Sequence, residues 1–122
     1  MRLIFLSHHT SKQLLESLLD HIHGAYAPNT LRAYRADMRE FIEYCGQVTA
    51  NALPADSLTI SRFLMSTVSQ GIKNSTVRRK AASISAVHRL LSYADPTKHP
   101  EVKITLKKYP DNLVTGLIRP IP

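Results

Sequence analysis

Residues 73–91, KNSTVRRKAASISAVHRLL, carry two different stripes if they are wound into one helix. The apolar stripe repeats at alternating spacings of four and three residues and consists of Val77, Ala81, Ile84, His88 and Leu91. A second stripe, roughly 110° away at about 100° per residue, carries hydroxyls and cations at Thr76, Arg79, Lys80 and Ser83. The pattern predicts an amphipathic helix with one face on a core. The polar face could either bond the phosphates and base edges of DNA or simply be solvated.

The rest of the chain keeps the same helical period, and no segment sustains a period of two. Five helices are expected, over residues 11–23, 30–45, 57–70, 73–91 and 100–109. Their apolar stripes have to be buried against one another, so the predicted fold class is all-α, a compact bundle of four to five helices. At 122 residues the chain is long enough for one domain with a modest core.

Turn and cap residues set the expected ends of these helices. Glycines 24, 46 and 71 stand where the first three should stop. Polar residues suited to capping precede each start: Thr10, Asn29 or Thr30, Asp56 or Ser57, and Asn74 or Ser75. We therefore expect a domain over residues 10–109, an N-terminal arm over 1–9, and a linker or tail over 110–122, where proline is frequent.

The positive charge of the chain is concentrated in one third of its length. Residues 71–109 hold nine lysines and arginines against two acids, whereas residues 1–70 hold six of each, so this third accounts for the net charge of +7. Such an asymmetry favours a polyanionic partner, double-stranded DNA above all. No apolar run approaches the length of a membrane span or a signal peptide, and there is a single cysteine, so we expect a cytoplasmic, nucleoid-associated protein.

A second group of cations lies on the helix expected over residues 30–45. Three arginines share one stripe and repel one another by a few tenths of a kcal/mol, namely Arg32, Arg35 and Arg39. Contact with a phosphate backbone would remove that repulsion. Alternatively, acids of the same helix neutralise the charge, namely Asp37, Glu40 and Glu43. Arg39 is suitably spaced to pair with Glu43, which leaves Arg32 and Arg35 without an evident partner.

The residues that might support catalysis or bind a metal do not converge in the sequence. His21 and His23 are two apart on a helix and point about 200° away from each other, and no cluster of cysteines or carboxylates completes a ligand set. His88, on the apolar stripe, is expected to be packed with a ring nitrogen hydrogen-bonded, and Cys45 to be structural. We therefore expect no metal site, no cofactor and no catalytic residue.

Residues 26–109 are similar in their motifs, and in the order of those motifs, to one known family. The motifs are Asn-Thr-Leu-x-x-Tyr at 29–34, Leu-Pro at 53–54, a glycine followed by Ser-Thr-x-x-Arg at 75–79, a histidine near the end of the fourth helix and Leu-Lys at 106–107. Together they resemble the N-terminal core-binding domain, also called the SAM-like domain, of tyrosine recombinases such as phage integrases and the Cre and Xer recombinases.

The resemblance implies a helical bundle that forms one half of a clamp around a recombination half-site, with the second and fourth helices in the major groove. By position, the implied groove-facing residues are Thr30, Arg32, Ala33, Arg35 or Ala36, Thr76, Arg79, Lys80 and Ser83. Arg39, Lys107 and Lys108 complete the set of expected DNA contacts. The resemblance also implies contacts between recombinase subunits on DNA through the first and last helices. The apolar stripe of the first helix is about 140° wide, so Leu15 or Leu19 could serve this contact in a chain that is monomeric when free.

The sequence departs from the family pattern in the residues that cut DNA. The family cleaves DNA in a C-terminal domain with a His-x-x-Arg box and a tyrosine nucleophile, but no histidine here is followed three positions later by arginine. We therefore expect no enzymatic activity from this chain, which would be a fragment or a natural truncation of a DNA-breaking and rejoining recombinase. The function expected is that of its DNA-binding domain. The alternative is a helical protein-interaction module that uses its apolar first helix and leaves the basic face solvated.

Overall fold

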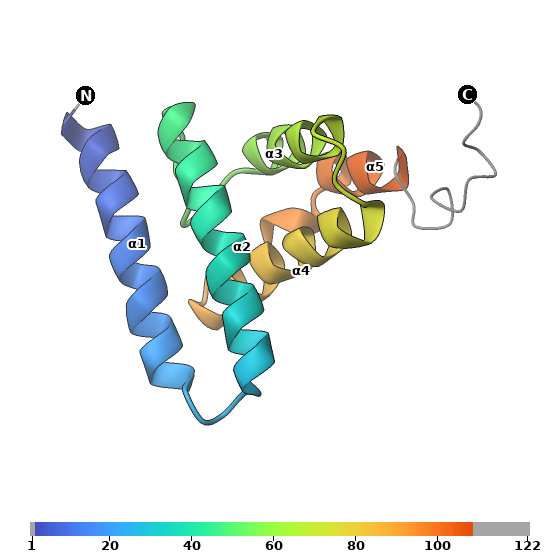
Figure 1. Cartoon of the computed structure of the whole chain (residues 1–122). Coiled ribbons are helices and arrows are strands. Elements are labelled where there is room, and N and C mark those ends of the chain that lie inside the picture. The colour runs from blue at the N-terminus through green and yellow to red at the C-terminus, as the bar shows by residue number, and fades with distance from the viewer. Residues whose placement is uncertain (1, 109–122) are drawn as a thin grey trace.

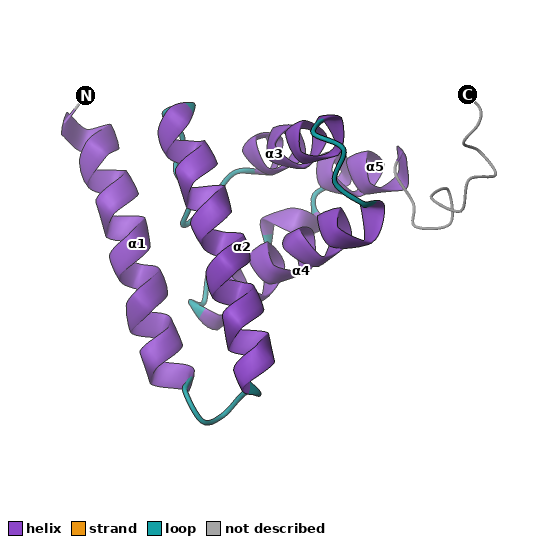
Figure 2. Cartoon of the chain, viewed as in Figure 1, coloured by secondary structure: helices purple, strands orange, loops and turns teal. Residues whose placement is uncertain are grey.

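The computed structural model describes the backbone of residues 2–108 and the side chains from His9 onward. The described chain forms α1 (Arg2–Ile22), α2 (Pro28–Gln47), α3 (Ser57–Ser69), α4 (Asn74–Leu90), a short 3₁₀ turn η1 (Pro96–Lys98) and α5 (Pro100–Lys108) (Figure 1). Within this range there is no strand, as Figure 2 shows, and the prediction of an all-α bundle is confirmed. None of the described helices is long and apolar enough to cross a membrane.

Two groups of helices meet along α2. α1 and α2 form an antiparallel pair joined by a short turn, and α4 packs against the other side of α2, with α3 and α5 beside it (Figure 1). The core lies where these groups meet. Phe41 and Ile42 of α2 are fully buried, and the ring of Phe63 on α3 stands edge-on to Phe41 with 5.1 Å between ring centroids. α2 is therefore the central helix. Beside its core-facing residues, it also lies next to α1 on one side and α4 on the other, where polar contacts can form.

Some of the predicted helix ends are confirmed and others are wrong. The Asp56 carboxylate accepts the Thr59 N–H at 2.7 Å and caps α3, and Gly24 and Gly71 adopt the left-handed backbone, at φ +90° and +86°, that suits a helix stop. α2 instead begins at Pro28, because proline is favoured in the first turn, and α4 begins at Asn74 after Lys73. α2 also runs past Gly46 to Gln47.

The first helix is longer than the sequence pattern predicted. α1 begins at Arg2, nine residues before the expected start at residue 11, so Thr10 lies inside the helix and does not cap it. The segment 2–10 contains no glycine or proline to stop the helix from extending toward the N-terminus. The residues expected to form an arm, 1–9, are thus helical from Arg2 onward, whereas the expected linker or tail over 110–122 lies outside the described residues.

The prediction that Leu15 or Leu19 forms an exposed edge of α1 is wrong. Leu15 is 1% exposed and Leu19 is 3% exposed, and both belong to the main hydrophobic cluster together with Leu18 and Ile22. These leucines are buried because α2 lies alongside α1 as an antiparallel partner and both helices contribute to one hydrophobic core. Among the side chains of α1 that the structure describes, this burial removes the exposed leucine edge that the interaction-module alternative would use.

His88 is packed and hydrogen-bonded, as predicted. Its ring is fully buried, Nε2 accepts the backbone N–H of Ala55 at 3.0 Å, and Nδ1 lies 2.8 Å from the carbonyl oxygen of Ile84. Because Nε2 accepts, the proton of a neutral ring belongs on Nδ1, which donates to Ile84. His88 thereby ties α4 to the loop before α3. Cys45 is also buried, and burial raises the pKa of its thiol to about 12.

His88 predicts a loss of stability in mild acid. Burial lowers the pKa of its imidazole, so the unfolded chain takes up this proton at a higher pH than the folded chain does. The free energy of unfolding should therefore be fully retained above pH ~6.5 and fall by up to about 1.4 kcal/mol per pH unit below it. Urea titrations between pH 7.5 and 5 would measure this slope. In His88→Gln, whose side-chain oxygen can still accept from Ala55, the slope should be absent, and an unchanged slope would contradict the assignment.

Ser61 on α3 is the buried residue with an unsatisfied side chain in the described part of the chain. It is 1% exposed, and its hydroxyl has no hydrogen-bond partner there. Ser61→Ala should therefore raise the free energy of unfolding by about 1 kcal/mol, because an uncompensated buried hydroxyl is removed. Ser83→Ala is the matched control, since Ser83 is equally buried but donates to Asp37, and it should lower stability by about 1 kcal/mol. Denaturant titration would measure the free energy of unfolding of both variants. A change in the same direction for both would show that burial of the hydroxyl, and not its hydrogen bonding, decides the effect.

Candidate nucleic-acid interface

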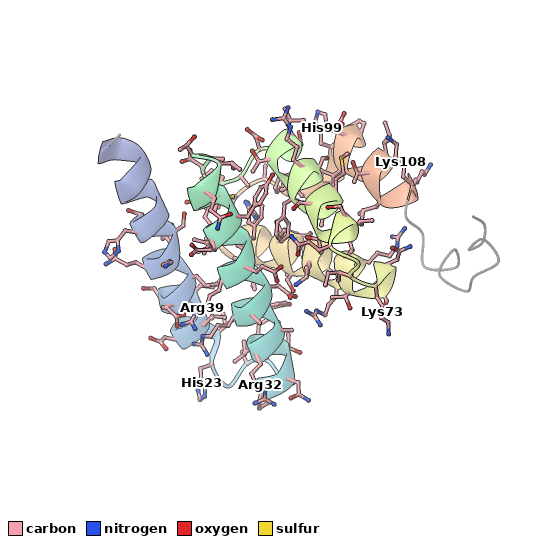
Figure 3. All side chains as sticks on the ribbon, turned by 45° about the horizontal axis from the view of Figure 1, so that its top comes forward. His23, Arg32, Arg39, Lys73, His99 and Lys108 are labelled. Atoms are coloured by element: carbon pink, nitrogen blue, oxygen red, sulfur yellow. The ribbon has the colours of Figure 1, made fainter. Side chains whose placement is uncertain are left out.

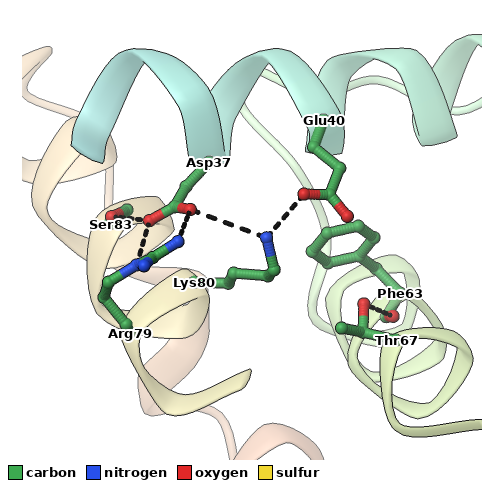
Figure 4. A network of polar contacts seen from close by, with 7 residues as sticks. All are labelled: Asp37, Glu40, Phe63, Thr67, Arg79, Lys80 and Ser83. Atoms are coloured by element: carbon green, nitrogen blue, oxygen red, sulfur yellow. Dashed lines mark hydrogen bonds and ion pairs between the residues drawn. The ribbon is translucent and has the colours of Figure 1, made fainter. Parts of the chain in front are cut away.

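A buried carboxylate on α2 holds an arginine of α4. The Asp37 side chain is 0% exposed, and its oxygens accept Arg79 Nη2–H at 2.6 Å and Nε–H at 3.1 Å (Figure 4). Ser83 donates its hydroxyl to the same carboxylate at 2.6 Å. The Arg79 side chain is nevertheless 52% exposed, and the hydrogen bonds to Asp37 raise the pKa of its guanidinium. Arg79 is thus fixed on one edge and open to solvent on the other.

The adjacent cation, Lys80, lies inside the junction between α2 and α4. Its side chain is only 8% exposed, and its ammonium is 2.5 Å from Glu40 Oε1 and 3.6 Å from Asp37 Oδ1 (Figure 4). The prediction that Lys80 and Ser83 belong to an exposed polar stripe is therefore wrong. These two side chains of α4 face α2 instead. Asp37 and Glu40 are three residues apart on α2, so they lie on the same side of that helix and form an acidic edge that contacts Lys80 and Ser83. That acidic spacing was the available signal in the sequence, where these acids were considered only as alternative partners for arginines of their own helix.

The arginines on the outer side of α2 are held by α1. Glu16 accepts from Arg35 through Nη2 at 2.9 Å and Nε at 3.3 Å, and from Arg39 through Nη2 at 3.0 Å. Arg35 was expected to have no evident partner, and its bonds to Glu16 correct that expectation. Arg39, which was expected to pair with Glu43, also bonds Glu16. The bond from Arg35 lowers the pKa of the Glu16 carboxyl. Because the three side chains remain 40–62% exposed, the arginines keep much of their surface for another partner.

Arg32 and Thr30 lie at the start of α2, near the turn that follows α1. Arg32 is exposed, its guanidinium contacts the Asn29 side chain three residues earlier, and Figure 3 shows it close to His23. Thr30 is partly buried. Arg32 and Arg35 also line a hollow of the surface together with Tyr26. Arg32 is thus the expected contact residue of α2 that has no acidic partner in the described structure.

A third cationic area forms where the start of α4 meets the end of α5. Arg78 donates to the backbone carbonyl of Leu106 at 2.9 Å and so ties the two helix ends together. Lys107 and Lys108, both predicted contacts, are exposed on α5. Lys73, which was not among the predicted contacts, is also exposed, immediately before α4 (Figure 3). Thr76 is partly buried in the first turns of α4.

This arrangement suits the binding of a polyanion. Arg32, Arg35 and Arg39 on α2, and Arg79 on α4, all keep exposed surface, and exposed lysines lie at the end of α5. Among the described residues, no three histidine, cysteine or carboxylate side chains come together as metal ligands would.

Comparison with known families assigns this fold. The family model described as the phage integrase N-terminal SAM-like domain matches residues 12–95. The chain belongs to this family. The resemblance inferred from motifs over residues 26–109 is thereby confirmed at the level of the family, and the matched residues are those of an N-terminal domain and not of a catalytic domain. The match begins in the middle of α1, at residue 12, and ends at residue 95, just before η1.

A curated protein supports the same assignment for the SAM-like domain. The tyrosine recombinase XerD of Bradyrhizobium diazoefficiens is 33% identical to this chain over 64 residues. The similar region covers 52% of this chain but only 20% of the relative. The SAM-like domain therefore corresponds to a small part of that recombinase.

Proposed function

We propose that this SAM-like domain is the DNA-binding part of a site-specific tyrosine recombinase or integrase. α2 and α4 would face the major groove of a recombination half-site, and the end of α5 would contact the phosphate backbone. The proposed contacts are Thr30, Arg32, Arg35, Arg39, Thr76, Arg79, Lys107 and Lys108. Lys80 and Ser83 are left out of this set because both are buried, and we propose that they support the contact residues from below.

The observation that carries this proposal is the placement of Arg79. One edge of its guanidinium is anchored on the buried Asp37 while the side chain stays half exposed, so its remaining N–H groups can bond an anionic partner in a fixed geometry. α2 and α4, which would both enter the groove, meet at this residue. The family and the XerD relative indicate the class of partner, because that relative is a tyrosine recombinase.

Strand cleavage and subunit assembly are assigned to the parent recombinase by the same reasoning. The matched residues form an N-terminal domain, so we infer that cleavage is performed by residues outside it. Contacts between subunits on DNA would use α1 and α5. Since Leu15 and Leu19 are core residues, the α1 contact would use other residues of this helix.

Duplex DNA binding with a steep salt dependence is the direct test of this function. A single small module should bind a fluorescently labelled duplex with a Kd in the micromolar range or somewhat lower at about 50 mM salt. If about five phosphates are contacted, log K should fall with log salt at a slope of roughly −4 to −5. Fluorescence anisotropy over a series of salt concentrations measures both values. The absence of binding at low salt, or a slope near zero, would exclude the proposal.

Two double variants with the same change in charge locate the surface. Arg32→Ala with Arg79→Ala removes proposed contacts from α2 and α4, and it should lower affinity about 10- to 100-fold and make the salt slope shallower by about 2. Arg89→Ala with Lys98→Ala removes two cations from outside the proposed surface, where Arg89 lies 3.8 Å from Asp95, and it should leave the slope unchanged. Equal losses from both pairs would indicate diffuse electrostatic attraction.

A further inference from the structure

We propose that Asp37 is a positioning residue for DNA recognition, which holds the guanidinium of Arg79 so that its free edge faces the DNA. The proposal rests on the proposed DNA-binding function. Asp37 is acidic and fully buried, and it would nevertheless strengthen the binding of DNA, which is itself negatively charged.

The geometry of the pair decides which part of Arg79 remains available. Asp37 engages Nε–H and one N–H of Nη2, which is the side edge of the guanidinium. A guanidinium has five N–H donors in a fixed plane, so three remain, two on Nη1 and one on Nη2. One from each nitrogen runs parallel at the tip of the side chain. This second fork suits two phosphate oxygens, or the O6 and N7 atoms of guanine, which are both acceptor pairs of DNA.

The anchor is rigid because Asp37 has its own supports. Its carboxylate is excluded from solvent, accepts the Ser83 hydroxyl at 2.6 Å and lies 3.6 Å from the Lys80 ammonium. Ser83 lies one helical turn beyond Arg79 on α4, so the backbone that carries the arginine also fixes its partner. A guanidinium held in this way loses less conformational freedom when DNA binds, and the affinity rises accordingly.

A second pair in the structure repeats the arrangement. Glu16 engages the Nε and Nη2 edge of Arg35, the same edge that Asp37 engages on Arg79. The two arginines lie on α2 and α4, the helices that would enter the groove. Glu16 is 41% exposed, however, whereas Asp37 is fully buried, so the hold on Arg35 is weaker. Asp37 is therefore the residue whose positioning effect should be measurable.

The test is the sign of the effect when the charge of Asp37 is removed. Removing an acid beside DNA normally strengthens binding, but Asp37→Asn should weaken the binding of a labelled duplex about tenfold, because Arg79 is released. Glu40→Gln is the matched control on the same helix, since Glu40 hydrogen-bonds to Lys80 whereas Asp37 is the acid that hydrogen-bonds to Arg79, and it should leave the affinity unchanged or raise it. Stronger binding by Asp37→Asn, or equal effects of both changes, would overturn the proposal.

A double-mutant cycle separates positioning from a purely structural role. If Asp37 acts through Arg79, Asp37→Asn should cause no further loss of affinity once Arg79→Ala is present. An additional tenfold loss in that background would show that Asp37 acts by supporting the fold, and would contradict the proposal. Circular dichroism at the temperature of the binding assay establishes that each variant is folded.

Arg79→Lys provides a test that leaves Asp37 in place if Asp37→Asn does not fold. A lysine has a single ammonium, which Asp37 would draw toward itself, and it has no second edge. Its affinity should therefore fall about as far as that of Arg79→Ala, although the charge is kept. Wild-type affinity in Arg79→Lys would overturn the positioning role while leaving DNA binding itself intact. Failure of the wild-type chain to bind any duplex would instead refute the proposed function.

Discussion

Leu15→Glu is expected to unfold the domain. Leu15 is 1% exposed and sits among the core side chains shared by α1 and α2. The change removes an apolar side chain from a filled site, at a cost of about 2–5 kcal/mol, and places an unpaired carboxylate there, at a cost of several kcal/mol more. The sum is comparable to the whole stability of a small domain, which is roughly 5–15 kcal/mol. Circular dichroism should show the loss of helical signal.

Gln13→Glu is the control for this change. Gln13 is exposed on the same helix, two residues away, so the same new charge should alter stability by less than about 0.5 kcal/mol. Leu15→Ala separates the two contributions, since it removes the apolar contacts without adding a charge and should cost about 2–5 kcal/mol. A folded Leu15→Glu variant with reduced cooperativity on paired half-sites would restore the exposed-edge interpretation of α1.

Asp37→Ala is expected to cause the second largest loss, about 3–5 kcal/mol in the free energy of unfolding. The change leaves the buried Ser83 hydroxyl without its acceptor and removes one of the two carboxylates near Lys80. Lys80 is the partner that stays desolvated, at 8% exposure, and breaking a buried ion pair from one side has this size of effect. Urea or thermal denaturation followed by circular dichroism would measure it. Asp37→Asn should cost less, because its amide oxygen can still accept from Ser83.

Lys80→Met tests whether the loss comes from Asp37 itself or from the junction in general. Methionine fills the volume of the lysine stem, Asp37 keeps Arg79 and Ser83, and the Glu40 partner is half exposed, so the cost should be about 1 kcal/mol or less. Equal losses for Lys80→Met and Asp37→Ala would show that the whole network contributes as one unit. A loss below about 1 kcal/mol for Asp37→Ala would contradict the central place given to this carboxylate.

The helices themselves were largely predictable because their signals are local. The stripe of Val77, Ala81, Ile84 and His88 identifies α4 and its buried face, and a glycine marks the stop of α3. Errors appeared where a local preference had a competitor. Asn29 and Thr30 are good caps, but Pro28 starts α2 before them, and Thr10 resembles a cap only if α1 is assumed to start there.

The candidate site was predictable in its residue types but not in its orientation. The sequence by itself determined an all-α domain with a charge excess in residues 71–109, arginines at helical spacing on residues 32–39 and a packed histidine at the end of α4. Only the tertiary structure decided which cations remain available. Lys80 and Arg79 are neighbours in the sequence, yet Asp37 and Glu40 bury one and leave the other half exposed. The partners lie about 40 residues apart, and no local pattern encodes such a pairing, because it depends on how α2 and α4 pack.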